Sequence, residues 1–219
     1  MNTRSGDAGV KQLLIMIDGE GGLAELDDTT RKTAVTNHYK WVEAAKTLGC
    51  HSIRVNAYGV SDDGAALHTA AVDGLGMLAS FAEKMGINVI VENHGGLSSD
   101  GKWLAGVIKE INMPGCGTLP DFGNFCLKHT DDGMGHSNCV EEYDRYQGVA
   151  ELIPFAKAVS AKSYDFDAAG NETTIDYTRM ISIVKKSSYK GYLGVEYEGS
   201  RLSEYDGIKA TKKLLERLI

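Results

Sequence analysis

The sequence predicts an α/β fold of the (β/α)8 TIM-barrel type in which about six parallel strands are present. Apolar, β-branched runs alternate with helical patterns along the whole chain, an order typical of parallel strands joined by helical crossovers. Most of these runs are apolar almost throughout, as in strands buried on both faces. Polar side chains end strand after strand, and only a barrel brings six such ends to one mouth.

An open, doubly wound sheet is the competing fold. It would have a Gly-x-Gly-x-x-Gly phosphate loop after its first strand, and residues 18–22 read Asp-Gly-Glu-Gly-Gly instead. The predicted strands are 12–18, 52–57, 87–92, 117–122, 158–163 and 191–196. The first predicted helix is capped by Asp28 or Thr29 and ended by Gly49. The other predicted helices are 62–84, 98–111, 140–152, one around 175–184, and 203–218. Because a complete barrel has eight strands, we expect residues 1–219 to be a single barrel domain that lacks its first two βα units.

Composition narrows the function classes. The formal net charge of −7 disfavours nucleic-acid binding, which needs clustered lysine and arginine. No unbroken apolar run approaches the roughly 18 residues of a membrane helix, so no membrane partner is expected. The cysteines at 50, 116, 126 and 139 form no Cys-x-x-Cys pair. They are expected to be free thiols in a reducing compartment, and with no signal peptide in the printed sequence the predicted location is cytoplasmic.

Three carboxylates end three different buried strands. Glu92 ends the third predicted strand, Asp121 lies in the fourth, and Glu196 ends the sixth. Each alone would be read as a helix cap or a surface ion pair. Three at equivalent strand ends would repel one another unless they held a cation. Oxygen ligands favour Mn²⁺, Mg²⁺ or a similar ion, so the sequence predicts a divalent metal site.

Four short segments resemble the xylose isomerase-like TIM-barrel superfamily and, more narrowly, the sugar phosphate isomerases/epimerases. They occur in the order and spacing of that family, from about Lys11 to the end of the chain. The segments are Val-Glu-Asn-His-Gly-Gly (91–96), Leu-Pro-Asp-Phe-Gly-Asn (119–124), Ser-Ala-Lys-Ser-Tyr-Asp-Phe-Asp (160–167) and Gly-Val-Glu-Tyr-Glu-Gly (194–199).

The resemblance implies a ligand set. In the family the metal is held by a Glu ending the fifth strand, an Asp ending the sixth, a His on the seventh and a Glu ending the eighth. These positions correspond to Glu92, Asp121, Ser160 and Glu196. Ser160 stands where the family has its histidine, two residues before Lys162, and a hydroxyl binds a divalent ion more weakly than imidazole. The resemblance also makes residues 12–18 the third barrel strand.

The implied activity is isomerisation or epimerisation of a small sugar through proton transfer and an enediolate. The implied cofactor is Mn²⁺, with Mg²⁺, Co²⁺ or Zn²⁺ as alternatives. Glu92 and Glu196 take the acid and base roles, and Lys162 either stabilises the enediolate or only pairs with a neighbouring carboxylate. Glu198 is expected to play a structural part.

Four further residues are candidates for substrate binding. His94 lies in a glycine-rich loop after the third predicted strand, and Asn124 stands where the family often has histidine. Asn56 lies near the barrel mouth, whereas Arg54 either binds an anionic group or forms an ion pair in the barrel floor. His94, Asp165 or water are candidates for completing the metal shell.

The long polar segment from Cys126 to Cys139 contains His129, Asp131, Asp132 and His136 and is predicted to be a lid or specificity loop.

Several alternatives remain. A lyase or dehydratase acting on an inosose or keto-sugar would use the same proton abstraction. A catalytically inactive, truncated barrel would bind a ligand or partner, and a homo-oligomer would cover its open strand edges. An apurinic-site endonuclease is disfavoured, since it would need more histidines and a basic surface.

Overall fold

The computed structural model describes residues 1–131 and 137–219. The chain forms two compact units, the first made of Met1–Glu92 and Ala105–Thr118, the second of Asn93–Leu104 and Leu119–Ile219. That residues 1–219 form a single domain remains a prediction.

The first unit is built on a sheet with the strand order β1-β2-β3-β4. Its strands are β1 (Leu14–Met16), β2 (Ser52–Val55), β3 (Asn88–Glu92) and β4 (Cys116–Leu119). β1 pairs with β2, and β2 with β3, in parallel. Every residue of β2 and β4 is buried, as the continuously apolar sequence runs predicted.

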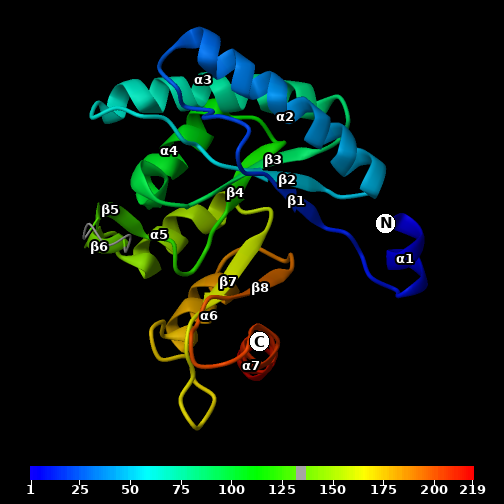
Figure 1. The fold of residues 1–219 in the computed structure, drawn as a ribbon, viewed down its shortest axis with the longest axis vertical. Helices are drawn as coiled ribbons and strands as arrows, with labels where there is room; N and C mark the ends of the chain where they lie inside the picture. The colour runs from blue at the N-terminus through cyan, green and yellow to red at the C-terminus, as the bar shows by residue number, and fades with distance from the viewer. Residues whose placement is uncertain (132–136) are drawn as a thin grey trace. The chain divides into compact units, whose positions relative to one another are not determined.

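The helices of the first unit are α1 (Asn2–Asp7), α2 (Asp28–Leu48), α3 (Gly64–Glu83) and most of α4 (Gly101–Ile111). α2 and α3 lie side by side over the sheet (Figure 1). The side chain of Asp27 accepts a hydrogen bond from the Thr30 amide, so the N-cap precedes both predicted candidates, Asp28 and Thr29. Gly49 ends the helix with φ of 76°, a left-handed conformation that glycine adopts without strain.

Among the described helices, α3 alone has the length and apolar composition of a membrane span. Its fully buried residues Leu75 and Leu78 belong to the core, and α3 contacts both α2 and β3. These contacts explain its apolar composition as that of a core helix.

The second unit continues the parallel pattern. Residues 120–122, directly after β4, pair in parallel with Ser160 of β7 (Val159–Ser163). β7 pairs in parallel with β8 (Leu193–Tyr197). Among the described residues, β1, β2, β3, β7 and β8 have parallel partners, as does Asp121 directly after β4, and these elements lie at the six predicted strand positions.

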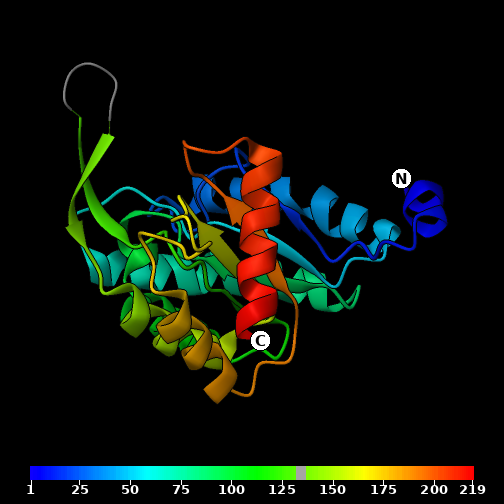
Figure 2. The same ribbon diagram turned by 90° about the horizontal axis from the view of Figure 1, so that it is seen from below.

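The helices of the second unit are η1 (Gly96–Ser99), α5 (Arg145–Leu152), η2 (Ile153–Phe155), α6 (Tyr177–Lys186) and α7 (Glu204–Leu218). Figure 2 shows α7, in red, alongside β8, with which it is in contact. The unit packs around a core that includes Phe122, Phe125, Ile175, Met180 and Leu214. The Tyr177 hydroxyl donates to the carbonyls of Ala161 and Lys162, which ties α6 to β7.

The segment from Cys126 to Cys139 corrects two predictions. It is an antiparallel hairpin of β5 (Cys126–Asp131) and β6 (Ser137–Glu142) where a loop was predicted, and its role as a lid or specificity element stays a prediction. The predicted helix 140–152 therefore begins only at Arg145, because residues 140–142 belong to β6. Asp132 and His136, named in the lid prediction, lie outside the described residues.

The hairpin also corrects the prediction of four free thiols. Cys126 and Cys139 form a disulfide with their Cα atoms 5.7 Å apart, whereas Cys50 and Cys116 are free and buried. No Cys-x-x-Cys spacing signals this pair, because pairing across a hairpin depends on the strand register. A disulfide is more typical of an oxidising compartment than of the cytosol.

Candidate active site at the strand ends

Glu92 ends β3 in the first unit and is 1% exposed. Its Oε2 lies 2.6 Å from Nε of Arg54, which is 4% exposed. Nη1 of Arg54 also lies 2.7 Å from Oδ1 of Asp18, and the Asn56 amide donates to the same oxygen. Arg54 thus forms a buried ion pair with Glu92, and Asn56 lies in the same network. The two predicted roles of Arg54 stay predictions.

Asp121 lies directly after β4 in the second unit and is fully buried. Its Oδ1 accepts hydrogen bonds of 2.8 Å from the backbone amides of Gly123 and Asn124. Its Oδ2 is buried and has no hydrogen-bond partner among the described residues. Burial is the main cause that raises the pKa of Asp121 to about 6, although the positive charge of Lys162 opposes the shift.

Asn93 positions this loop, and the sequence did not identify it. It is fully buried, and its Oδ1 accepts a 2.7 Å hydrogen bond from the Asp121 amide. Its Nδ2 donates to the carbonyls of Asp121 and Asn124. A single asparagine in a glycine-rich loop gives no sequence signal for this role, because the role depends on contacts with residues about 30 positions away.

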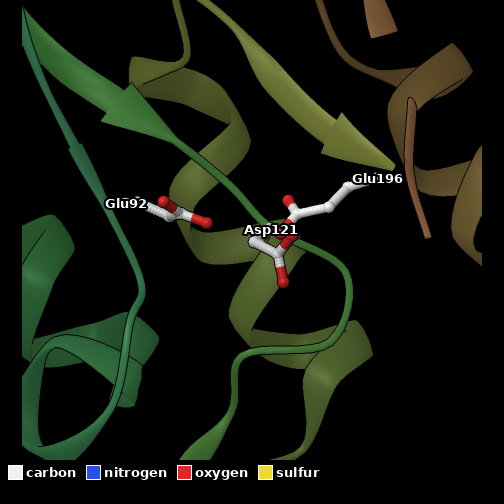
Figure 3. Close-up of side chains that lie close together, drawn as sticks. All are labelled: Glu92, Asp121 and Glu196. Carbon is white, nitrogen blue, oxygen red and sulfur yellow. The ribbon is translucent and has the colours of Figure 1, made fainter. Parts of the chain in front are cut away.

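Glu196 lies on β8 in register with Lys162 on β7. Its Oε2 accepts a 2.8 Å hydrogen bond from the Ser160 hydroxyl, and its Oε1 lies 3.0 Å from Nζ of Lys162. Carboxylate oxygens of Glu196 and Asp121 lie within 4.8 Å of each other, and Figure 3 shows both side chains. Ser160, the weak ligand candidate, thus contacts a carboxylate that is itself a candidate ligand.

Lys162 is 1% exposed and pairs with two carboxylates. Besides Glu196, its Nζ lies 2.9 Å from Oε1 of Glu198. Burial lowers the pKa of Lys162, but the negative charges of Asp121, Glu198 and Glu196 outweigh burial and raise this pKa above its ordinary value. Lys162 is therefore an ammonium ion at neutral pH, and Glu198 has the structural contact expected of it.

A cavity of about 380 Å³ lies in the second unit. Its lining includes His94, Gly123, Asn124 and Tyr164. A Cβ on Gly123 would lie 2.6 Å from the Tyr164 hydroxyl and 2.8 Å from Cδ of Lys162. Glycine at this position therefore lets the cavity wall lie directly against the Lys162 side chain.

The predicted site residues thus form two groups. Glu92, Arg54 and Asn56 lie in one network of the first unit. The second unit brings the other predicted residues together: Asp121, Ser160, Lys162, Glu196, His94 and Asn124. The assignment of Glu92, which Figure 3 also labels, to one metal centre with Asp121 and Glu196 remains a prediction.

Parallel strands with helical crossovers and acidic side chains at strand ends define a TIM-barrel type of α/β protein. Residues 4–219 match the family described as xylose isomerase-like TIM barrel, and the chain belongs to this family. The fold and family predicted from the sequence are thereby confirmed.

Among curated proteins, the C-glycoside deglycosidase alpha subunit of Arthrobacter globiformis is 39% identical over 66 residues. That match covers 29% of this chain and only 19% of that protein. Among solved structures, D-allulose 3-epimerase from Methylomonas sp. matches with a TM-score of 0.74 at 14% identity, covering 100% of this chain and 81% of that one. A 3-keto-D-glucoside 4-epimerase from E. coli matches with a TM-score of 0.68 at 18% identity, covering 99% and 82%.

Two further matches were crystallised with metals. A xylose isomerase-like protein from Mycobacterium smegmatis, in complex with magnesium, has a TM-score of 0.66 at 19% identity and covers 99% of this chain and 76% of that one. The IOLI protein with a bound zinc atom has a TM-score of 0.66 at 16% identity and covers 95% and 76%. At these identities the likeness shows the fold.

Proposed function

We propose that this protein is a metal-dependent isomerase or epimerase that acts on a sugar, keto-sugar or sugar phosphate by proton transfer next to a carbonyl. The observation that carries the proposal is Asp121, a fully buried carboxylate with one buried oxygen that has no hydrogen-bond partner among the described residues. The sugar epimerases among the structural matches support the substrate class.

The donor set fits a divalent ion. Asp121 offers a buried oxygen next to the carboxylate of Glu196, and Glu92 completes the three strand-end acids that the family resemblance implies. All three offer carboxylate oxygens, which Mn²⁺ and Mg²⁺ prefer. When bound, the ion would polarise the carbonyl and hydroxyl oxygens of the substrate. Mn²⁺ is our first choice of metal.

Glu196 and Glu92 would move the proton. One carboxylate removes the proton from the carbon next to the carbonyl, and an acid on the opposite face returns a proton to give the epimer. Ser160 and Lys162 bind separate oxygens of Glu196 and so restrict how its carboxylate turns. A base held in one orientation is better placed for transfer.

Lys162 would stabilise the negative oxygen that develops in the enediolate. Its side-chain carbons lie beside Gly123 in the cavity wall, and its ammonium group pairs with Glu196 and Glu198. A positive group positioned before the reaction needs no reorganisation when charge develops. His94, Asn124 and Asn56 remain our candidates for contacts with substrate hydroxyls.

Metal binding is the first test. At a Mn²⁺ concentration about 100 times its Kd, the ion should add about 2.7 kcal/mol to the unfolding free energy. This corresponds to a rise in Tm of roughly 5–10 °C for a chain of this size. Glu196→Gln should abolish the rise. Glu198→Gln is the matched control and should keep it, because Glu198 contacts Lys162 and is not a proposed ligand. No rise with Mn²⁺, Mg²⁺, Co²⁺ or Zn²⁺ would refute the proposal.

Proton transfer is the second test. In D₂O with Mn²⁺, the intact protein should introduce deuterium into a substrate sugar beside its carbonyl, which NMR detects. Glu196→Gln should abolish the exchange. Exchange without a new isomer would point to an incomplete reaction, and no exchange across a panel of ketoses and keto-glycosides would favour the inactive-barrel alternative.

A lyase is the second candidate. The curated relative is named a C-glycoside deglycosidase, and one structural match is named for a 3-keto-D-glucoside. Removal of the same proton could be followed by loss of a group from the adjacent carbon, which gives an unsaturated keto-sugar. Product analysis with a 3-keto-glucoside separates the two, because epimerisation conserves mass and elimination releases the leaving group.

A cytoplasmic location and a homo-oligomeric state remain predictions. The Cys126–Cys139 disulfide weighs against the first, since such bonds persist mainly in oxidising compartments.

A further inference from the structure

The cavity of the second unit has polar groups that the proposed reaction does not use. Nη1 of Arg145 is buried without a hydrogen-bond partner among the described residues, although the side chain lines the cavity. Tyr164 also lines the cavity, and its hydroxyl lies close to Gly123 in the same lining. A buried donor without a partner is costly in a folded protein. A small turn of the Arg145 side chain toward the cavity would let a ligand that supplies oxygen atoms remove that cost.

The charge in the cavity indicates what kind of ligand fits. Arg145 is the only side chain of its described lining with a permanent positive charge, and it is paired with Glu142, which lines the same cavity. Lys162 is already paired with Glu196 and Glu198. A phosphate carries nearly two negative charges and usually binds several cations or a free bidentate arginine. Neutral hydroxyl groups, in contrast, can accept from Arg145 and donate to Glu142.

The cavity is also in the right place and of the right size. Tyr164, in its lining, lies next to Gly123, whose amide donates to Asp121. The volume of about 380 Å³ is within the range of small-molecule sites. A substrate whose reacting carbons lay near Asp121 would therefore extend its other end toward Arg145.

We propose that Arg145 and Tyr164, with Glu142, form a specificity subsite that binds the non-reacting hydroxyl groups of an uncharged sugar or glycoside, so that the natural substrate is not phosphorylated at that end. This inference rests on the proposed function and narrows its substrate class. Arg145 and Tyr164 act in binding, and they take no part in proton transfer.

The experiment measures binding directly, by saturation-transfer NMR on the full chain with Mn²⁺. The probes are D-fructose and methyl β-D-glucoside, each compared with its 6-phosphate. Arg145→Met should raise the Kd of at least one neutral sugar by about 10-fold or more, as expected for hydrogen bonds to a charged group. Tyr164→Phe should raise it by roughly 3–10-fold. Arg145→Lys should recover part of the affinity.

The matched control is Arg4→Met on exposed α1, which should leave every Kd unchanged. Amide NMR spectra establish that each variant is folded.

The inference is overturned if a 6-phosphate binds 10-fold or more tightly than its neutral sugar, if neither neutral sugar shows saturable binding, or if both variants bind as the wild type does. Deuterium exchange is measured separately. If Glu196→Gln abolishes exchange but Arg145→Met leaves every Kd unchanged, the subsite is refuted and the proposed function stands. If Arg145→Met raises the Kd but the wild type shows neither exchange nor a metal effect, the proposed function is refuted and the subsite stands.

Discussion

Lys162 faces more negative charge than one ammonium group can balance. It lies against Glu196 and Glu198, and Asp121 is close enough to raise its pKa. Removal of the Lys162 charge would leave the neighbouring carboxylates without a positive partner. The resulting loss of stability is larger than the net stabilisation that the intact ion pair provides. At the scale of single residues, the stability of each charged group in the site therefore depends on the opposite charges beside it.

Lys162→Met tests this dependence. In metal-free protein we expect the free energy of unfolding to fall by about 2–3 kcal/mol, less than for a fully buried pair because Glu196 and Glu198 are partly exposed. Urea titration with EDTA measures the change. The matched control is Lys212→Met on α7, whose exposed ion pair should contribute less than about 0.5 kcal/mol. Equal effects of the two substitutions would contradict the interpretation.

His38 offers a test by pH. It is 3% exposed, its Nδ1 lies 2.7 Å from the Ala34 carbonyl, and burial lowers its pKa below the usual 6.5. The unfolded chain therefore binds a proton more readily than the folded protein, so stability is lost as the pH falls below about 6.5. His38→Asn should remove up to about 1.4 kcal/mol per pH unit of that slope. Urea titrations at several pH values between 5 and 7.5 measure it, and parallel slopes for the two proteins would contradict the prediction.

Two elements, the β5–β6 hairpin and α5, form much of the cavity wall. The disulfide between Cys126 and Cys139 joins the two strands, and the Tyr143 amide donates to the Phe125 carbonyl. Gly148 lets α5 lie against Phe125, since a Cβ there would be 2.2 Å from the ring. The position of Arg145, at the start of α5, depends on these contacts.

The disulfide should stabilise the fold. It closes a loop of 13 residues, for which chain entropy accounts for about 3 kcal/mol. We expect dithiothreitol to lower the urea midpoint of the wild type and to have no effect on a Cys126→Ser/Cys139→Ser variant. A wild type that is insensitive to reductant, with its thiols shown to be reduced, would contradict a stabilising role.

Two helical glycines form a matched pair. Gly148→Ala should destabilise the protein by about 1–3 kcal/mol because the methyl group overlaps Phe125. Gly76→Ala in α3 should be neutral or stabilising by up to about 1 kcal/mol, since nothing lies within 4 Å of its new Cβ. Thermal unfolding of both variants measures the difference, and a destabilising Gly76→Ala would count against the argument.

At the scale of the whole molecule, the proposed ligands belong to both compact units: Glu92 to the first, and Asp121 and Glu196 to the second. Each unit has one tryptophan, Trp41 in the first and Trp103 in the second. The unfolding of each unit can therefore be followed by its own fluorescence signal.

Two variants provide these signals. Trp41→Phe keeps Trp103 as the reporter of the second unit, and Trp103→Phe keeps Trp41 as the reporter of the first. If one ion binds all three carboxylates, Mn²⁺ should raise the unfolding midpoint of both reporters and bring the two midpoints together. Glu92→Gln should abolish the shift in both. A Mn²⁺ shift confined to the Trp103 reporter would mean that Glu92 is not a ligand.

The sequence by itself determined the order of strands and helices, the six parallel strands and the carboxylates at their ends. Continuous apolar runs require burial on both faces, and that requirement can be read without knowing the neighbours. Gly49 was recognised as a helix end because glycine adopts the left-handed conformation that ends many helices. The small error at Asp27 is of the size that helix ends allow, whereas α5 begins five residues later than predicted because residues 140–142 belong to β6.

Only the tertiary structure decided which groups meet. It paired Cys126 with Cys139, placed Asn93 under the Asp121 loop, directed Ser160 to Glu196, and brought Arg145 into a cavity wall with its Nη1 buried and without a hydrogen-bond partner among the described residues. Each of these contacts joins residues from different strands, loops or helices. Their distance depends on strand register and helix packing, and no local sequence pattern contains that information.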